Sequence, residues 1–175
     1  MNPSELDELY RGVGRCIWHL QYLEDVLHTL LVLKIDIREP GRVSEKEANA
    51  ALAKYRRASL GTALGIAEKH GALPAGLLAK LRILKEERDW LVHRSMHQQG
   101  DTLYTDEGRT SVFSRLAKFM EESVSLKGLA LEEVASFTAT HGVSSVRVEA
   151  IAQQKIARPF LAKVPGKVFA MACRI

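Results

Sequence analysis

Apolar residues in the first part of the chain recur at intervals of three and four positions without interruption. This spacing follows one face of an α-helix, whose period is about 3.6 residues. We therefore predict one long amphipathic helix over residues 4–35, with Ser4 as its N-cap behind Pro3. The apolar stripe consists of Leu6, Leu9, Val13, Cys16, Leu20, Leu23, Leu27 and Leu30.

Capping signals and turn residues mark two further helices. Ser44 with Glu47 three residues later has the pattern of a capping box, so a second helix should begin there. We expect this helix to end at Gly71. Pro74 suits the first turn of a third helix, which continues to about residue 96.

The polar segment QQGDTLYTDEGR, residues 98–109, connects the third helix to a fourth, expected over roughly residues 108–126. A small hairpin through Leu103 and Tyr104 is one interpretation of that connection. The following sequence, LALEEVASFTATHG, either continues the fourth helix past Gly128 or forms a separate short helix.

Helices with short connections, and no convincing series of strands, predict an all-α fold. We expect an antiparallel helical bundle of four to five helices over residues 1–140. Residues 141–175 form a basic C-terminal segment, which either packs on the bundle or forms an extra helix. Its last ten residues, GKVFAMACRI, are compatible with strand or helix.

Composition places the chain among ordinary globular proteins. Its 175 residues, 46% hydrophobic and 26% charged, suit one domain with a sizeable core. Two cysteines, Cys16 and Cys173, do not make a disulfide framework and suit a reducing cytoplasm. The N-terminal sequence lacks the features of a signal peptide, and no apolar run reaches the roughly 20 residues of a membrane helix. We therefore expect a cytoplasmic protein without a membrane partner.

The net charge of +4 is unevenly distributed. Residues 141–175 contain six basic residues against the single acidic residue Glu149. Such a segment, with Lys163 and Lys167, could hold a phosphate backbone, or its lysines could simply keep the chain in solution. The cluster Tyr55-Arg56-Arg57 could likewise stack on RNA or form a solvated helix face. Arg94 is a further candidate nucleic-acid contact.

The third predicted helix carries an unusual arginine. On a helical wheel Arg88 lies in the middle of the apolar face, within about 60° of its neighbours on that face. An unpaired charge in such a position is too costly to persist, so an acidic side chain, a bound anion or a solvent-filled cleft must accompany it. The apolar neighbours are Leu77, Leu81, Leu84, Leu91 and Val92.

Two polar residues follow Arg88 on this helix. Asp89 and His93 are four residues apart, so the carboxylate could orient the imidazole. Arg88 and His93 lie about 140° apart on an α-helix, so one helix cannot easily aim both at a single atom, whereas two copies facing each other across a symmetric interface could. Arginine can bind a phosphate bidentately, and histidine can transfer protons to and from its oxygens.

Structural interpretations of the same residues remain open. Arg88 could be buried in an ion pair with Glu24 or Asp25 of the first helix, with His93 half-exposed. His93 and His97 have a spacing that can bind zinc, but no third ligand is evident except Asp89. Trp18 and Trp90 are typical core or interface anchors.

The sequence LRILKEERDWLVHRSM resembles the motif helix of the HEPN superfamily, in which an arginine, a polar residue and a histidine recur. Arg88, Asp89 and His93 match these three positions. IWHLQYLEDVLHTLL is similar to the long opening helix of these proteins. The resemblance implies a helical bundle over roughly residues 4–126 that dimerises through its motif helices. Many members are metal-independent ribonucleases, often toxins or anti-phage effectors, in which the arginine and histidine are catalytic.

Two positions depart from the commoner family pattern. Asp89 stands where asparagine is more frequent. In one toxin subgroup a tyrosine two residues after the histidine is modified by a nucleotidyltransferase antitoxin, and here that position is Ser95. Some family members only bind ligands or partners and have no activity.

Residues and resemblance together lead to one functional expectation and one alternative. The expectation is a homodimeric, metal-independent endoribonuclease with no cofactor, whose partners are RNA and potentially an antitoxin protein. Arg88 would hold the phosphate, His93 would act as general acid or base, Asp89 would orient His93, and Glu24 would position Arg88. The alternative is a non-catalytic helical module that binds a nucleotide, a nucleic acid or a protein.

Overall fold

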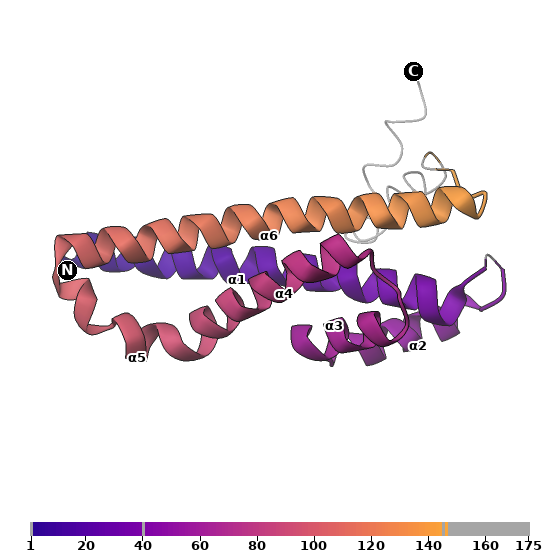
Figure 1. The fold of residues 1–175 in the computed structure, drawn as a ribbon, viewed down its shortest axis with the longest axis horizontal. Coiled ribbons are helices and arrows are strands. Elements are labelled where there is room, and N and C mark those ends of the chain that lie inside the picture. Colours follow the sequence, from indigo (N-terminus) through magenta and orange to yellow (C-terminus); the bar gives the residue numbers. More distant parts are fainter. Residues whose placement is uncertain (1, 40, 145, 147–175) are drawn as a thin grey trace, which may run out of the picture. The chain divides into compact units, whose positions relative to one another are not determined.

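The computed structural model describes residues 2–39, 41–144 and 146, and it confirms the all-α fold class. Helices are the only regular elements in these ranges (Figure 1). The chain divides into two compact units between Val134 and Ala135, and the first unit contains every site discussed below. The helices are α1 (Pro3–Leu31), η1 (Val32–Ile37), α2 (Glu45–Tyr55), α3 (Leu60–Lys69), α4 (Ala75–Asp89), η2 (Trp90–Arg94), α5 (Ser95–Gln99), η3 (Asp101–Tyr104) and α6 (Asp106–Thr140).

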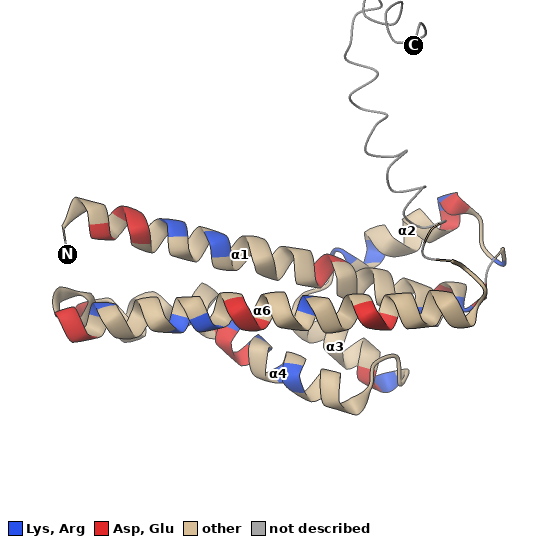
Figure 2. Ribbon diagram, turned by 90° about the horizontal axis from the view of Figure 1, so that it is seen from above, with Lys and Arg blue, Asp and Glu red and all other residues tan. Residues whose placement is uncertain are grey.

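Within the first unit, α1 and α6 run in the same direction, and α4 returns antiparallel to both (Figure 1). Ion pairs join α1 and η1 to α6 near both ends, from Glu5 to Arg109 at 3.4 Å and from Lys34 to Glu133 at 2.9 Å. Acidic and basic residues both occur along α1 and along α6, so neither helix is purely basic (Figure 2). The basic excess expected of residues 147–175, including Lys163 and Lys167, lies outside the described residues.

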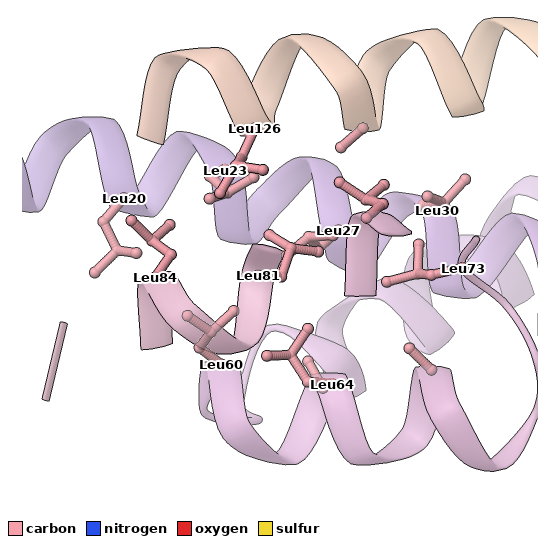
Figure 3. Packing of buried hydrophobic residues seen from close by; sticks show 14 of the residues in the cluster. Leu20, Leu23, Leu27, Leu30, Leu60, Leu64, Leu73, Leu81, Leu84 and Leu126 are labelled. Carbon is pink, nitrogen blue, oxygen red and sulfur yellow. The ribbon is translucent and has the colours of Figure 1, made fainter. Parts of the chain in front are cut away.

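Leucines from several helices form the core of this unit (Figure 3). The predicted α1 stripe is confirmed in its second half, where its members are almost fully buried. These members are Cys16, Leu20, Leu23, Leu27 and Leu30. Each buried leucine contributes roughly 1.5–3 kcal/mol from the removal of apolar surface from water. The stripe packs against Leu60 and Leu64 of α3 and Leu81 and Leu84 of α4, with Leu126 of α6 above it.

The predicted helix starts are partly confirmed. Ser44 and Glu47 form the expected capping box, because the Ser44 amide donates to the Glu47 carboxylate at 2.9 Å and the Glu47 amide donates to Ser44 Oγ. The first helix, however, is capped by Asn2 and not by Ser4, with Glu5 completing a capping box. Proline has no N–H to bond and its φ is already helical, so Pro3 occupies the first helical position and the cap moves to the residue before it.

The second predicted helix is in fact two helices, α2 and α3. Residues 56–59, between the buried Tyr55 and Leu60, are a turn and not helix. Ser59 accepts a hydrogen bond from the Thr62 amide at 3.2 Å and so begins α3. The predicted end at Gly71 is confirmed, since Gly71 has a φ of +59°, the left-handed conformation that glycine adopts without strain.

The predicted hairpin through Leu103 and Tyr104 is wrong, because these residues belong to the 3₁₀ turn η3. A Cβ at Gly108 would overlap the Thr102 carbonyl, so glycine allows this turn to pack against the start of α6. Of the two alternatives for the following segment, the continuous one is correct, since α6 passes Gly128 without a break.

The alkylation rate of the Cys16 thiol tests the packing of α1 against α6. Its thiol is buried, it donates to the Leu116 carbonyl at 3.3 Å, and burial raises its pKa to about 11. In a Cys173→Ser variant, which leaves Cys16 as the only thiol, we expect alkylation at pH 7.5 to be at least about a hundredfold slower than in urea-unfolded protein. Equal rates in folded and unfolded protein would contradict this packing.

The buried side chain of His28 makes the stability of the folded protein depend on pH. The ring is 4% exposed, and its burial lowers its pKa, with Asp25 opposing and Arg56 adding to this effect. The folded state therefore resists protonation, and stability is lost as pH falls below the unfolded pKa of about 6.5, by at most about 1.4 kcal/mol per pH unit. Urea unfolding at pH 7.5 and 5.5 should show a smaller loss in His28→Gln than in wild type. The exposed His70→Gln is the control, and an unchanged loss in His28→Gln would refute the assignment.

Candidate functional site

Arg88 lies in the last turn of α4, one turn beyond the buried Leu84. One guanidinium nitrogen, Nη1, is 3.1 Å from Asp89 Oδ1 and 3.1 Å from His93 Nε2. The Arg88 side chain is 25% exposed, so the charge reaches the surface although its Nε atom is buried without a partner in the described structure. An acidic neighbour, a histidine and partial solvation together accompany the charge on the apolar face.

A π-helical turn brings Arg88 and His93 together. The amide of Ser95 donates to the carbonyl of Trp90, five residues back, instead of to that of Leu91. This wider turn reduces the angle around the helix axis between side chains five residues apart, which is about 140° in an α-helix. The expectation that one helix could not aim both residues at one point is therefore wrong, because it assumed a regular α-helix.

Neighbouring side chains explain why the turn widens here. Trp90 and Leu91, at the start of this turn, are both buried. The Arg115 guanidinium of α6 lies 3.7 Å from the Trp90 ring centroid and pairs with Glu87 at 2.8 Å. Ser95 Oγ donates to the Leu91 carbonyl at 2.9 Å, in place of the amide that has moved to Trp90.

Asp89 does not contact His93 in the described structure, contrary to the expected orienting role. Its carboxylate accepts hydrogen bonds from Lys85 at 2.8 Å and from Arg88. These bonds, with Lys85 the stronger influence, lower the pKa of Asp89. The Asp89 carboxylate is already engaged by Lys85 on one oxygen and by Arg88 on the other. Asp89 instead holds Arg88 in place.

The contact between Arg88 and His93 defines the tautomer of the histidine. A guanidinium can only donate, so His93 Nε2 must accept. As a hydrogen bond, this contact requires the tautomer with a proton on Nδ1 and none on Nε2. A chain of polar contacts thus runs from Lys85 through Asp89 and Arg88 to His93, and it ends on an exposed ring.

Glu24 of α1 is close enough to interact electrostatically with Arg88. Burial raises the pKa of Glu24, and the positive charge of Arg88 opposes this rise. Asp25, the other carboxylate considered as a partner, instead pairs with Arg56 at 2.6 Å. Among the described contacts, the ion pair of Arg88 is made with Asp89 and not with α1.

Two of the predicted nucleic-acid contacts, Arg56 and Arg94, already have partners within the described residues. Arg56 is engaged with Asp25, and Arg57 is exposed. Arg94 donates to the Glu86 carbonyl at 3.2 Å and lies 3.9 Å from the Glu86 carboxylate.

An exposed aromatic and basic surface on α1 was not anticipated from the sequence. Trp18 and Tyr22 are 60% and 49% exposed and form an edge-to-face pair with centroids 5.7 Å apart. Arg11 and Arg15 line a recess of about 360 Å³ beside Trp18. Trp18 is therefore no core anchor, although Trp90 is. The available signal was that Trp18 and Tyr22 fall one turn apart, outside the apolar stripe.

Neither a metal cluster nor a membrane span is formed by the described residues. No group of three or more His, Cys, Asp or Glu side chains in this part of the chain is arranged to hold a metal ion. Of the helices in this part, none combines the length and apolarity required to cross a bilayer. Comparison with known proteins found no matching family model, no matching curated protein and no matching solved structure.

Proposed function

We propose that the protein is a metal-independent endoribonuclease of HEPN type that acts at the Arg88–His93 pair. The observation that carries this proposal is the 3.1 Å contact between Arg88 Nη1 and the neutral His93 Nε2 at a partly exposed surface. A permanent cation beside a neutral imidazole supplies a phosphate ligand and a general base within one turn of chain.

In the proposed mechanism, substrate binding releases the histidine. A phosphodiester oxygen replaces His93 Nε2 as the acceptor of the Arg88 N–H group, so Nε2 becomes free. Nε2 then removes the proton from the 2′-hydroxyl, the 2′-oxygen attacks phosphorus, and the bond to the 5′-oxygen breaks. Arg88 stabilises the additional charge on the phosphoryl oxygens. The leaving 5′-oxygen takes a proton from the imidazolium formed when His93 Nε2 is protonated. The products are a 2′,3′-cyclic phosphate and a 5′-hydroxyl.

A homodimer would supply two such pairs to one cleft. Val92 and Met96, on the same segment as His93, are 43% and 78% exposed, and this apolar surface supports self-association there. The exposed Trp18, Tyr22 and Arg15 of α1 support RNA as the partner, because aromatic rings stack on bases beside cations. A toxin or defence role, with an antitoxin as a further partner, belongs to the same proposal.

The alternative is a non-catalytic module that binds a nucleic acid or a protein. The observation favouring it is that Arg88 already has both Asp89 and His93 as partners without any ligand. In that case the polar chain would fix the π turn, and α1 would provide the binding surface.

An RNA cleavage assay without metal ions distinguishes the endoribonuclease from the non-catalytic module. Purified wild type, Arg88→Ala and the control Arg82→Ala would be incubated with mixed RNA in EDTA, and the product ends analysed. Arg82 lies on the same helix and pairs with Glu68. We expect cyclic phosphate products from wild type and Arg82→Ala, and about 10²–10³-fold slower cleavage by folded Arg88→Ala. Equal cleavage by all three, or none by wild type, would overturn the proposal.

A further inference from the structure

Lys85 lies one turn before Asp89 on α4, and its ammonium group occupies one oxygen of the Asp89 carboxylate. Lys85 Nζ donates to Asp89 Oδ2 at 2.8 Å, whereas Arg88 Nη1 bonds to the other oxygen, Oδ1, at 3.1 Å. The bond from Lys85 is also the largest cause of the lowered pKa of Asp89. Each oxygen of this carboxylate therefore has a different cation as its donor.

The single bond to Asp89 leaves part of the Arg88 guanidinium free. Its second terminal nitrogen, Nη2, has no hydrogen-bond partner among the described residues. Solvent reaches Nη2, because only the Nε atom of this guanidinium is both buried and unpartnered. A guanidinium and a carboxylate often pair through two parallel N–H···O bonds, and such a pair would engage Nη2 as well. Lys85 opposes that second bond, because it holds Oδ2 toward itself and neutralises the charge that would attract Nη2.

A glycine of α3 gives the Lys85 side chain the space that its bond to Asp89 needs. A Cβ added at Gly61 would lie 3.0 Å from Lys85 Cε and 3.7 Å from Cδ, so the side chain passes close to the α3 backbone. At Gly65, one turn later, an added Cβ would meet nothing within 4 Å. On an isolated helix, a basic residue four positions before an acidic one is the less favourable order. The contact with α3 therefore helps to hold Lys85 against Asp89.

We propose that Lys85 is a positioning residue for phosphate binding, which keeps Arg88 Nη2 available by restricting Asp89 to one bond with Arg88. Gly61 serves the same purpose indirectly, since it leaves room for the Lys85 side chain. This inference rests on the proposed nuclease function, in which the Arg88 guanidinium binds the scissile phosphate. Nη1, oriented by Asp89, and the free Nη2 then bind two oxygens of one phosphate.

Crystal structures of wild type and Lys85→Met test the effect on Arg88 without RNA. Methionine is also long and unbranched, but it has no charge and no N–H group. We expect Arg88 Nη2 to lie within about 3.2 Å of the Asp89 carboxylate in Lys85→Met and to be free of it in wild type. Gly61→Ala should move Lys85 Nζ away from Asp89, whereas Gly65→Ala should not. An unchanged contact between Arg88 and Asp89 in Lys85→Met would overturn the inference.

Cleavage rates test the consequence for catalysis. In EDTA, Lys85→Met should have a kcat/KM about tenfold below that of wild type, the effect of losing one hydrogen bond to a charged group. Lys80→Met makes the same change at an exposed position of the same helix and should retain the wild-type value. Adding Asp89→Asn to Lys85→Met should recover most of the loss, because asparagine lacks the charge that draws Nη2 away from the phosphate.

Recovery in the double variant separates positioning from a structural defect at position 85, which a second substitution at Asp89 would not repair. An unchanged kcat/KM in Lys85→Met, or no recovery in the double variant, would overturn the inference. If wild type does not cleave RNA, the nuclease proposal fails, and the crystal structures alone decide whether Lys85 keeps Arg88 Nη2 free.

Discussion

Replacing His93 with alanine should slow metal-free RNA cleavage by about 10²–10⁴-fold, the usual contribution of a general acid or base. The ring is exposed and its described contact is with Arg88 alone, so its removal leaves the core intact. The thermal midpoint should therefore change little. The rate of cleavage of a fluorogenic RNA in EDTA, at substrate concentrations below saturation, measures the effect.

The matched control for this variant is His97→Ala. His97 is an exposed histidine one turn further along the same segment, but it lies outside the polar chain from Lys85 to His93. We expect His97→Ala to cleave RNA at the wild-type rate. Similar losses in both variants would point to a general effect on this segment, and full activity of His93→Ala would remove His93 from the mechanism.

Replacing Leu84 with alanine should destabilise the protein by about 2–5 kcal/mol, the largest effect on stability that we expect. Leu84 is fully buried between α1 and α3, one turn before Arg88, so its removal leaves a cavity beneath the site (Figure 3). For a chain of this size the thermal midpoint falls by roughly 2–4 °C per kcal/mol. Chemical denaturation measures the change directly.

The neighbouring residue provides a control for Leu84→Ala. Ile83 is 64% exposed, so Ile83→Ala should change the free energy of unfolding by no more than about 0.5 kcal/mol. Similar losses in the two variants would show that α4 does not bury the face assigned to it.

The main helices could be predicted because their apolar residues follow one period. The α1 stripe and the capping box at Ser44 depend on local spacing, which the sequence contains directly. The break between α2 and α3 was missed because Ser44 and Gly71 were treated as the two ends of one helix. Ser59, directly before Leu60, was the available capping signal.

The candidate residues could be selected from the sequence, but their geometry could not. Arg88 was selected by its apolar position and Asp89 and His93 by their four-residue spacing, and all three match the motif of the family that the sequence resembles. Their arrangement depends on a π turn that has one tertiary contact, Arg115 of α6 above Trp90, and one local contact, the Ser95 hydroxyl to the Leu91 carbonyl. A helical wheel assumes a constant period, so it could not place His93 beside Arg88.

The proposed site depends on the π turn that brings Arg88 and His93 into contact, and one measurement tests this turn directly. Scalar couplings across hydrogen bonds, measured by NMR in ¹³C,¹⁵N-labelled protein, identify the carbonyl that accepts the Ser95 amide proton. We expect a coupling from Ser95 N to the Trp90 carbonyl carbon. A coupling to the Leu91 carbonyl carbon would indicate a regular α-helix, would place the two side chains about 140° apart and would contradict the proposed site.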